Sequence, residues 1–302
     1  MKMLKVFIDG REGTTGLQIE ERLRAMPGVT LLEPDPLLRK DAAERQRLIH
    51  SADAVFLCLP DAAARESAAL AEGSKAVIFD ASTAHRTHPD WVYGFPELSP
   101  ELGEAVKTSN RIAVPGCHAT GFCAIVYPLV WYGLVSAYNA LSCFSLTGYS
   151  GGGKAMIAEY EGENAPTDTR PYALTLAHKH LPEMQKVCGL YTPPVFMPAV
   201  VPVRQGMLVS VPLGAPDAPA KPLHACLEDW YAYAKHVRVM PFGGADALEA
   251  GRLPMQALNG TDDLEIFVFG HETQALVIAR FDNLGKGAAG AAVQCLKLRF
   301  GL

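Results

Sequence analysis

Residues 4–23 read LKVFIDGREGTTGLQIEERL, and this stretch decides the fold. The apolar run at residues 4–8 is typical of a buried strand, and the apolar positions within residues 17–23 favour a helix. Between them, residues 10–16 form a GxxGxxG turn. A strand, a glycine-rich turn and a helix in this order predict a dinucleotide-binding fold. In such a fold the glycines let the backbone approach a pyrophosphate, and the helix N-terminus supplies N–H donors.

The glycine spacing differs from the more common GxGxxG, and as a bare pattern it also suits an ordinary turn. Its place directly after the first strand favours phosphate binding. The cofactor contacts predicted from this turn are Gly10, Gly13, Thr14, Thr15 and Gly16.

The same alternation of strand and helix continues to about residue 116. Apolar runs predict strands at residues 29–32, 54–60 and 76–80, and helical patterns cover residues 40–50 and 61–72. Asp61 is a candidate N-cap of the second of these helices. Strands that alternate with helices indicate an α/β fold, with a parallel sheet and crossover helices.

After Gly116 the composition changes, with more aromatic residues and more glycine and proline. Further strands are predicted at residues 141–146, 195–203, 207–212, 264–270 and 274–282, and a helix near the C-terminal end. This pattern predicts a second, α+β domain with a mixed or antiparallel sheet.

Charge and hydropathy narrow the classes of partner. The 302 residues include 27 Lys and Arg against 32 Asp and Glu, a net charge of -5, and no basic run occurs. We therefore expect no nucleic-acid partner. The longest apolar stretch, near residues 120–135, is interrupted by Pro128 and Gly133, so we expect no membrane segment.

The seven cysteines are scattered and include no CxxC pair. An odd number without such pairs is typical of a protein in a reducing compartment, so we expect a cytoplasmic protein without a disulfide framework. Zinc-like spacing is also missing from the sequence, so we expect no metal.

Cys117 stands in the run VPGCHAT at residues 114–120. Pro115 and Gly116 favour a turn, and the residues after it can begin a helix. A thiol at a helix N-terminus has its thiolate stabilised, and the thiolate is the nucleophile. Cys117 is therefore the predicted catalytic nucleophile, whereas each other cysteine alone suits a buried structural role.

A thiol nucleophile needs an acid or base nearby, and an imidazole serves both roles. The run HKHLPE at residues 178–183 offers His178 and His180, followed by Glu183. Sequence spacing leaves open which histidine exchanges the proton.

Two further stretches could bind an anion. Residues 80–86 follow a predicted strand and lie at the carboxyl edge of the sheet, where ligands bind; they include Ser82 and Arg86. Residues 148–154 form a glycine-rich loop that ends in Lys154 and lacks the P-loop pattern. Arginine and lysine pair well with phosphate or carboxylate, although singly each is more often surface charge.

The residues that select between the two nicotinamide cofactors usually follow the second strand. An acid there binds the ribose 2′-OH, and a basic residue accommodates a 2′-phosphate. Residues 33–40 contain both signs, including Arg39 and Lys40, so this segment leaves the preference open and also suits a solvated loop.

Seven stretches resemble, in the same order, the shorter form of the N-acetyl-gamma-glutamyl-phosphate reductases of arginine biosynthesis. They cover residues 10–16, 80–86, 93–97, 115–117, 148–154, 178–183 and 282–290, and together span nearly the whole chain. The ending DNLGKGAAG is the most specific. The resemblance implies NADPH-dependent reduction of a small acyl phosphate, N-acetyl-glutamyl 5-phosphate, to N-acetyl-glutamate 5-semialdehyde with release of phosphate.

The resemblance also implies residue roles. Cys117 would form a thioester, His180 would be the acid and base, and His178 would hold the substrate. Arg86 and Lys154 would bind phosphate or carboxylate, Glu183 would orient an imidazole, and Ser82 and Asn283 would contact NADP(H).

The family's architecture implies a Rossmann-like dinucleotide-binding domain of residues 1–116 plus 285–302. A catalytic and dimerisation domain of semialdehyde dehydrogenase type, residues 117–284, would be inserted in it. The resemblance further implies a homo-oligomer, either a dimer or a tetramer.

The chain departs from the family pattern at His118, where many relatives carry Tyr or Pro, and at Lys154, where the longer forms have Arg. Both departures concern fine substrate contacts. Two rival interpretations are an aspartate-semialdehyde dehydrogenase-like enzyme with a shorter acyl phosphate, and a non-catalytic dinucleotide-binding regulator. The presence of Cys117 together with the paired histidines argues against the regulator.

Overall fold

The computed structural model describes residues 3–302 except 216 and 218. The chain divides into two compact units: unit 1 is residues 1–115 with 288–302, and unit 2 is residues 116–287. The domain ranges expected from the sequence also contain residues 1, 2, 216 and 218, which lie outside the described residues.

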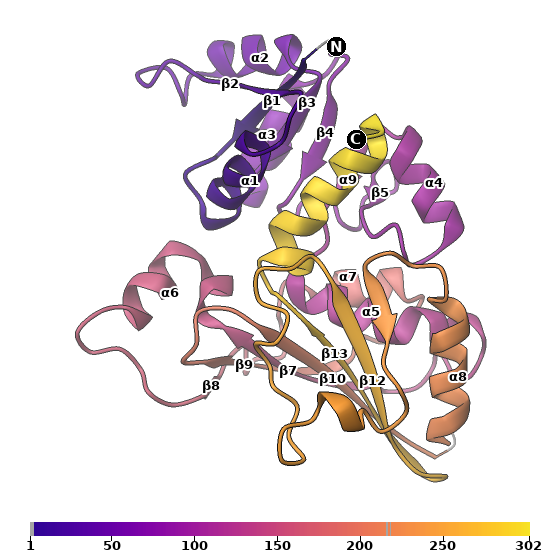
Figure 1. Ribbon diagram of the computed structural model, residues 1–302. Helices are drawn as coiled ribbons and strands as arrows, with labels where there is room; N and C mark the ends of the chain where they lie inside the picture. The colour runs from indigo at the N-terminus through magenta and orange to yellow at the C-terminus, as the bar shows by residue number, and fades with distance from the viewer. Residues whose placement is uncertain (1–2, 216, 218) are drawn as a thin grey trace. The chain divides into compact units, whose positions relative to one another are not determined.

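Unit 1 is built on a six-stranded parallel sheet with the order β2-β1-β3-β4-β6-β5 (Figure 1). The strands are β1 (Leu4–Asp9), β2 (Val29–Leu32), β3 (Ala54–Leu57), β4 (Val77–Asp80), β5 (Val92–Tyr93) and β6 (Arg111–Ala113). The predicted α/β class with a parallel sheet is confirmed.

Helices cover both faces of this sheet. They are α1 (Thr14–Arg24), α2 (Ala42–Ser51), α3 (Asp61–Leu70), α4 (Pro100–Thr108) and α9 (Gly290–Phe300). One apolar cluster joins α1, α4 and α9 to the side chains of Val6 and Ile8, and a second joins α2 and α3 to Phe7. Successive side chains of a strand point to opposite faces, so β1 serves both clusters. Figure 1 shows α9, the last helix of the chain, between α1 and α4.

The strand order places a topological switch point between β1 and β3. The connection from β1 leads to β2 on one side, and the chain then returns to β3 on the other. Ligands of such sheets bind in the crevice beyond the carboxyl ends of the strands at this point. Residues 10–13 follow β1 there, and Cys58 follows β3.

Local details of unit 1 differ from expectation. Helix α1 begins at Thr14, within the glycine-rich turn and not after it. The prediction that Asp61 caps α3 is wrong: the cap is Pro60, without a side-chain bond. The Asp61 carboxylate instead accepts hydrogen bonds from the backbone N–H (3.0 Å) and the hydroxyl of Thr83 in the loop after β4.

Unit 2 contains a seven-stranded mixed sheet with the order β11-β12-β13-β10-β7-β9-β8. The strands are β7 (Ser142–Gly148), β8 (Arg170–Pro171), β9 (Val195–Val201), β10 (Met207–Gly214), β11 (Val237–Val239), β12 (Leu264–Gly270) and β13 (Gln274–Phe281). This mixed sheet is the α+β arrangement that the change in composition predicted.

The helical elements of unit 2 are α5 (Cys117–Trp131), η1 (Tyr149–Gly152), α6 (Gly153–Tyr160), α7 (Leu181–Val187), α8 (Ala220–Trp230) and η2 (Ala245–Ala247). A π-helical turn, η3 (Gly285–Ala289), spans the boundary between the units. Helix α5 packs against β10 and β13 and against the neighbouring helices α7 and α8. Most of its residues are buried, so it forms the core of this unit. A Cβ at Gly121 would come within 2.6 Å of Val209, so glycine is needed where α5 meets β10.

Around β7 and β9 the other face of this sheet is exposed and partly apolar, whereas Phe267 on the same face of β12 is buried. Along β7 the residues alternate, with Cys143 and Ser145 buried and Phe144 exposed. Met197 on β9 is in register with Phe144 and is also exposed. Val195, two residues earlier on β9, lies on the same face.

Each helix formed by the described residues is too short or too polar to cross a membrane.

Gly10 provides a test of the turn that begins the fold. Its φ of +83° is in the left-handed region, and an added Cβ would lie 2.5 Å from the carbonyl oxygen of Cys58. We expect Gly10→Ala to lower the free energy of unfolding by about 2–4 kcal/mol through backbone strain and overpacking. Urea denaturation measures this loss.

Gly13→Ala is the matched control. An added Cβ at Gly13 meets no atom closer than 3.6 Å, and its φ is -72°. We expect near-normal stability for this variant. Equal losses for the two substitutions would contradict the assigned turn geometry.

Candidate active site

The turn after β1 is shaped to accept a phosphate. Gly13 caps α1 without a side-chain hydrogen bond, so the first N–H groups of this helix are left to a ligand. At Gly16 an added Cβ would come within 2.7 Å of the Arg11 backbone, which makes glycine necessary for the close turn. These observations fit the pyrophosphate of a dinucleotide cofactor.

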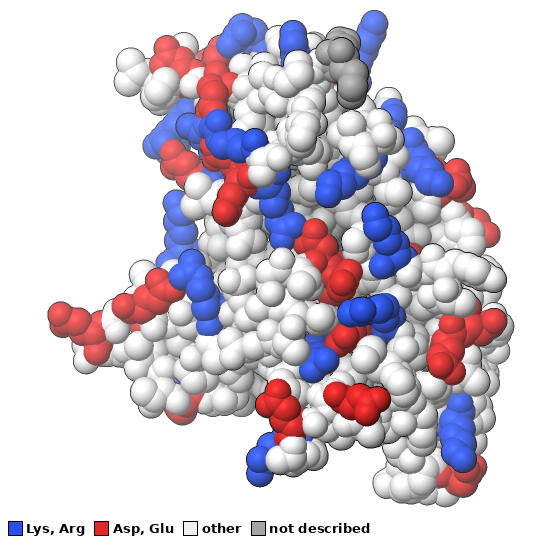
Figure 2. Space-filling model, viewed as in Figure 1, with Lys and Arg blue, Asp and Glu red and all other residues white. Residues whose placement is uncertain are grey.

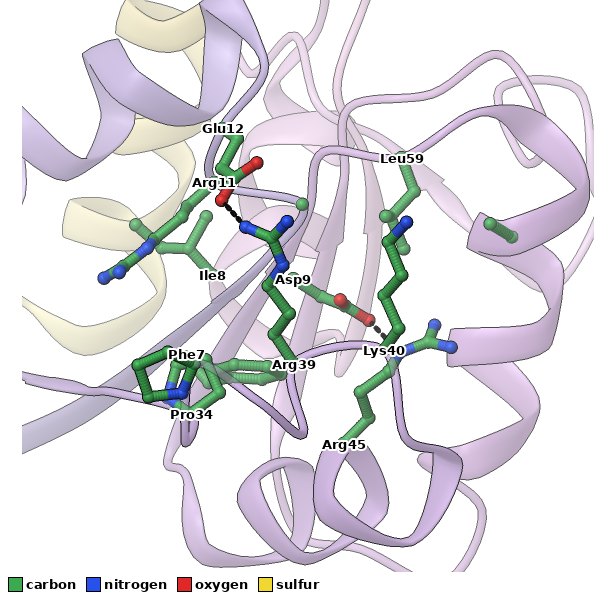
Figure 3. A pocket seen from close by; sticks show the side chains of 13 residues that line it. Phe7, Ile8, Asp9, Arg11, Glu12, Pro34, Arg39, Lys40, Arg45 and Leu59 are labelled. Atoms are coloured by element: carbon green, nitrogen blue, oxygen red, sulfur yellow. Dashed lines mark hydrogen bonds and ion pairs between the residues drawn. The ribbon is translucent and has the colours of Figure 1, made fainter.

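A cavity of about 470 Å³ opens beside this turn (Figure 3). Its volume is within the range of about 300–1,000 Å³ that is usual for small-molecule sites. The charged residues that line it are Asp9, Arg11, Glu12, Arg39, Lys40 and Arg45. Arg45 is fixed, because its Nε donates to the buried Asp9 carboxylate (3.0 Å). Arg39 pairs with Glu12 and is half-exposed.

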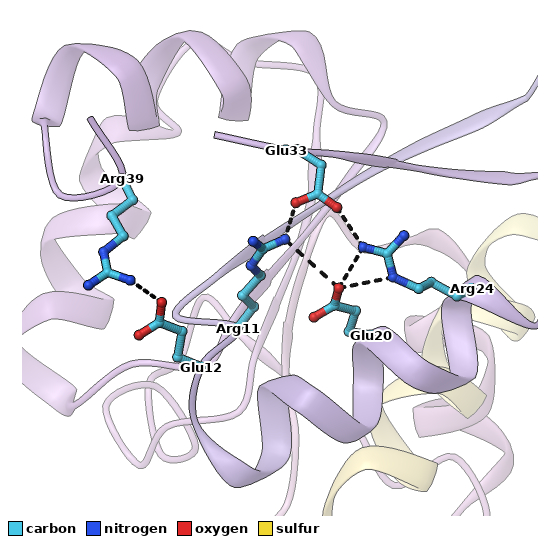
Figure 4. Close-up of polar contacts among 6 residues, drawn as sticks. All are labelled: Arg11, Glu12, Glu20, Arg24, Glu33 and Arg39. Carbon is cyan, nitrogen blue, oxygen red and sulfur yellow. Dashed lines mark hydrogen bonds and ion pairs between the residues drawn. The ribbon is translucent and has the colours of Figure 1, made fainter. Parts of the chain in front are cut away.

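A network of ion pairs surrounds the segment after β2 (Figure 4). The carboxylate of Glu33 pairs with Arg11 and, at 2.6 Å, with Arg24. Arg24 also donates to Glu20 (2.6 Å). Glu33 occupies the place where an acid would bind a ribose 2′-OH. Here its charge is already balanced by two guanidinium groups.

On the face of the molecule seen in Figure 2, Lys and Arg side chains are interspersed with Asp and Glu. The positive charge around the cavity is thus a local feature, within a chain whose net charge is -5.

The loop after β4 is held by the buried carboxylate of Asp80. Asp80 accepts from the backbone N–H (2.9 Å) and hydroxyl (2.8 Å) of Ser82, and a 2.6 Å contact joins it to His85 Nδ1. The His85 ring stacks on Trp91 at 4.0 Å between centroids. The predicted cofactor contact Ser82 therefore shapes this loop through its side chain.

Arg86 lies in the same loop and is partly buried. Its Nε donates to the carbonyl oxygen of Val114 (2.9 Å), and its Nη2 donates to that of Ala81 (3.1 Å). These bonds fix the guanidinium at the ends of β4 and β6, the edge of the sheet where ligands bind. Its role toward an anion stays a prediction.

Cys117 is the first residue of α5. The cap, Gly116, makes no side-chain hydrogen bond, so the positive end of a 15-residue helix faces the thiol region. The N–H of Gly116 donates to Oε1 of Glu183 (2.8 Å), and Glu183 is almost fully buried. Glu183 therefore fixes the turn before Cys117. The role expected for it, orienting an imidazole, stays a prediction.

The predicted histidines lie beside the start of α5. The ring centroids of His178 and His180 are 4.7 Å apart, and each lies within 5.6 Å of the His118 ring. The backbone N–H of His180 donates to Nδ1 of His178 (3.1 Å). Because Nδ1 accepts, neutral His178 carries its proton on Nε2. The structure thus brings His178, His180 and Glu183 together around residues 116–118.

His118 is buried at the centre of this cluster. Hydrogen bonds of 2.8 Å join its Nδ1 to the hydroxyl of Ser145 and its Nε2 to the hydroxyl of Tyr172. Burial, reinforced by the charges of His178 and Lys179, lowers the pKa of His118 to about 3. A neutral ring with both nitrogens engaged is unsuited to proton exchange, which leaves His178 and His180 for that role.

Lys154 and Asn283 occupy different surroundings. Lys154 is exposed in the first turn of α6. Asn283 is buried: it donates to Ser150 Oγ (3.0 Å) and accepts from the N–H of Gly206 (3.0 Å). Its amide thus anchors residues 148–154. The predicted cofactor contact of Asn283 and anion contact of Lys154 stay predictions.

Three other cysteines have thiols whose pKa is raised. Burial raises the pKa of Cys58 to about 12 and that of Cys226 to about 11, and it also raises the pKa of Cys143. Such thiols stay protonated and unreactive at neutral pH. None of the seven cysteines, all within the described residues, forms a disulfide.

Sequence reasoning missed Tyr172 and Ser145 and treated His118 only as a departure from a pattern. Tyr172 lies 54 positions from its partner His118 along the chain, so local spacing gave no signal. Among the described residues, no group of three or more His, Cys, Asp or Glu side chains is arranged to hold a metal ion.

Comparison with known families adds two matches. Residues 117–283 match the model of the semialdehyde dehydrogenase dimerisation domain, and residues 35–105 match that of the semialdehyde dehydrogenase NAD-binding domain.

Similar curated proteins carry one name. The chain is 45% identical over 310 residues to N-acetyl-gamma-glutamyl-phosphate reductase of Burkholderia cenocepacia, covering 100% of this chain and 98% of that protein. It is 45% identical over 304 residues to N-acetyl-gamma-glutamyl-phosphate reductase 2 of Pseudomonas putida, covering 98% and 96%. The relative in Nostoc, also named form 2, is 43% identical over 316 residues, covering 100% and 98%.

Solved structures show the same fold at low identity. Aspartate semialdehyde dehydrogenase II from Vibrio cholerae aligns with a TM-score of 0.71 at 20% identity, covering 100% of this chain and 99% of that one. Aspartate semialdehyde dehydrogenase with NADP from Candida albicans aligns with a TM-score of 0.61 at 16% identity, covering 98% of each chain.

Proposed function

The chain belongs to the N-acetyl-gamma-glutamyl-phosphate reductases of the semialdehyde dehydrogenase family, and we propose that it catalyses their reaction. In this reaction NADPH reduces N-acetyl-L-glutamyl 5-phosphate to N-acetyl-L-glutamate 5-semialdehyde, and phosphate is released. The enzyme thus acts in arginine biosynthesis. A cytoplasmic location stays a prediction.

The observation that carries this proposal is the setting of Cys117. It begins a 15-residue helix whose cap makes no side-chain bond, and the preceding turn is fixed by Glu183. Two histidines suited to proton exchange lie beside the same turn. A nucleophilic thiol with a fixed backbone and an imidazole partner is what acyl transfer requires.

The first step is acyl transfer to sulfur. The Cys117 thiolate attacks the carbonyl carbon of the acyl phosphate, the bond from this carbon to the phosphate oxygen breaks, and phosphate leaves with the electron pair. A thioester remains on Cys117. Arg86 and Lys154 are the cations proposed to bind the leaving phosphate or the substrate carboxylate.

The cofactor's phosphates fit the turn at residues 10–16 and the N-terminus of α1. When bound, NADPH supplies the hydride that reduces the thioester carbonyl. The reduced carbon then carries an oxyanion, which collapses to the aldehyde while the bond from carbon to sulfur breaks and the Cys117 thiolate is restored.

His180 is the proposed acid and base at this oxygen, giving a proton to the oxyanion and removing it on collapse. His178 suits a different task. Its Nδ1 already accepts a hydrogen bond, so its Nε2–H is a donor that can hold a substrate oxygen.

The enzyme run in reverse tests this proposal. We expect oxidation of N-acetylglutamate semialdehyde with NADP and phosphate to be faster than oxidation of aspartate semialdehyde, with NADPH absorbance as the readout. A faster reaction with the aspartyl compound would contradict the assigned substrate and favour the rival enzyme.

Cys117→Ser separates an enzyme from a dinucleotide-binding regulator. We expect this variant to lose at least 10³-fold in turnover because a hydroxyl is a far weaker nucleophile than a thiolate, while it still binds NADPH. Cys226→Ser, at a partly buried thiol of α8 whose pKa burial raises to about 11, is the control and should keep turnover. Normal turnover of Cys117→Ser would exclude the thioester route.

The charges around the cavity favour NADPH over NADH. Glu33 is balanced by Arg11 and Arg24. Arg39, which pairs with the exposed Glu12, and Lys40 line the cavity. We expect Arg39→Ala to raise the KM for NADPH about 10- to 100-fold, the effect of one charge-assisted phosphate contact, and to leave the KM for NADH nearly unchanged.

Arg47→Ala is the control, because Arg47 is exposed and pairs with Glu44 outside the cavity. Steady-state kinetics with both cofactors provide the comparison. An equal change in KM for NADPH and NADH would place the 2′-phosphate elsewhere.

The exposed face of the seven-stranded sheet is the proposed homodimer interface. The matching family model describes residues 117–283 as a dimerisation domain. The side chains of Phe144, Val195, Met197 and Leu276 lie exposed on β7, β9 and β13. An apolar sheet face of this kind is typical of an association surface.

We expect Met197→Glu to weaken the dimer, because each interface would bury two unpaired carboxylates. Light scattering coupled to gel filtration should show a lower mass than for the wild type. Tyr233→Glu changes a fully exposed aromatic residue after α8 and should keep the wild-type mass. An unchanged mass for Met197→Glu would exclude this face.

A further inference from the structure

A chain of three hydrogen-bonding side chains leads from the core of unit 2 toward Cys117. Ser145 is fully buried on the helix-covered face of β7, His118 is the second residue of α5, and Tyr172 directly follows β8. Both contacts in the chain are 2.8 Å long. Tyr172 ends the chain beside the nucleophile: its hydroxyl contacts His118, the residue after Cys117, and its ring centroid lies 5.8 Å from that of His178.

From this geometry we propose that the Tyr172 hydroxyl donates a hydrogen bond to the acyl oxygen of the substrate on Cys117, with His118 as its positioning residue. This inference rests on the proposed thioester chemistry. It adds a catalytic donor that the sequence pattern did not identify.

Each hydroxyl can donate or accept, so the tautomer of the His118 ring sets the direction of both hydrogen bonds. In the tautomer that the proposal assigns to His118, Ser145 donates its hydroxyl proton to Nδ1, and the ring donates its Nε2 proton to the Tyr172 oxygen. In this arrangement the Tyr172 oxygen accepts from His118, and its own proton is available to a ligand. His118 stays neutral throughout, because it is buried beside two other imidazoles.

A donor at this place matches the charge that develops in the reaction. Both the attack of the thiolate and the reduction of the thioester place negative charge on the acyl oxygen. A preorganised donor in a water-poor site stabilises this charge in the transition state. Because the raised pKa keeps the phenol protonated near neutral pH, Tyr172 can donate in both steps.

The backbone around Tyr172 is also constrained. The N–H of Tyr172 donates to the carbonyl oxygen of Pro198 (3.0 Å), and Pro198 is paired in register with Ser145. The next residue, Ala173, has a φ of +52°, and Leu176 has a φ of +56°. Left-handed backbone in residues other than glycine is uncommon and is concentrated at functional sites. The backbone between Tyr172 and His178 thus contains two residues in an unfavourable conformation, and this conformation brings the ring centroids of Tyr172 and His178 to within 5.8 Å of each other.

An alternative role for Tyr172 is to donate to the Cys117 thiolate itself and so control its charge. The two roles differ in what they predict. A donor to the thiolate changes the pH dependence of the thiol's reaction with iodoacetamide, whereas a donor to the acyl oxygen changes turnover only.

The test compares Tyr172→Phe with the wild type in the reverse reaction. We expect kcat to fall about 10²-fold, the usual cost of one lost oxyanion donor, and KM to change less than about 3-fold. The pH dependence of iodoacetamide alkylation at Cys117 should stay unchanged. Tyr132→Phe is the control, since its hydroxyl bonds the exposed Asp229 at the other end of α5.

The positioning role of His118 is tested by combining substitutions at His118 and Tyr172. His118→Phe should lower kcat about as much as Tyr172→Phe, and the double variant should lose little more, because both changes remove the same donor. His118→Gln, which keeps a donor amide, should retain more activity than His118→Phe. Circular dichroism and thermal unfolding of each variant show whether the fold is kept.

A wild-type kcat in folded Tyr172→Phe overturns the proposal. A shifted alkylation profile also overturns it, because Tyr172 would then act on the thiolate. Fully additive losses in the double variant overturn the positioning role of His118. If the wild type oxidises only aspartate semialdehyde, the proposed substrate is wrong. The kcat values of Tyr172→Phe and the wild type are then compared with aspartate semialdehyde, so the role of Tyr172 is still tested.

Discussion

The hydrogen bond from the N–H of Gly116 to the carboxylate of Glu183 fixes the turn before Cys117, on which the proposed chemistry depends. It is 2.8 Å long, buried, and joins residues 67 positions apart. A charged acceptor makes such a bond stronger than a neutral one, and its loss would leave a buried group without its partner. Because Glu183 is in the first turn of α7 and His180 caps that helix, the same bond sets the start of α5 beside the imidazoles.

The two units share one feature at the helices proposed to bind the cofactor and to carry the nucleophile. Gly13 caps α1 and Gly116 caps α5, and neither makes a side-chain capping bond. A serine or aspartate cap would satisfy these N–H groups internally. With glycine, the positive helix end has no side-chain cap, which suits the proposed cofactor phosphate in unit 1 and the proposed Cys117 thiolate in unit 2. Gly13 and Gly116 therefore affect the electrostatics of the helix ends as well as the backbone conformation.

The sequence predicted those parts whose determinants are local. Strand β2 at Val29–Leu32 and strand β12 at Leu264–Gly270 have the predicted bounds, because apolar runs flanked by polar residues define them. Strands β5 and β6 were missed since two or three residues carry no periodicity. The prediction of Cys117 as the nucleophile rests on a Pro-Gly turn at its own position, and the structure places it at the start of α5. In contrast, Tyr172, Ser145 and the bond from Gly116 to Glu183 depend on long-range contacts that only the folded chain reveals.

The central claim is that Cys117 carries the acyl group between two half-reactions. It is tested most directly by mixing the enzyme with N-acetylglutamyl phosphate in the absence of NADPH and then quenching in acid. Mass spectrometry of the digested protein should show an added N-acetylglutamyl group on the peptide that contains Cys117. Addition of NADPH before the quench should remove it. An unmodified Cys117 peptide from enzyme that turns over normally, or an acyl group on another residue, would contradict the account.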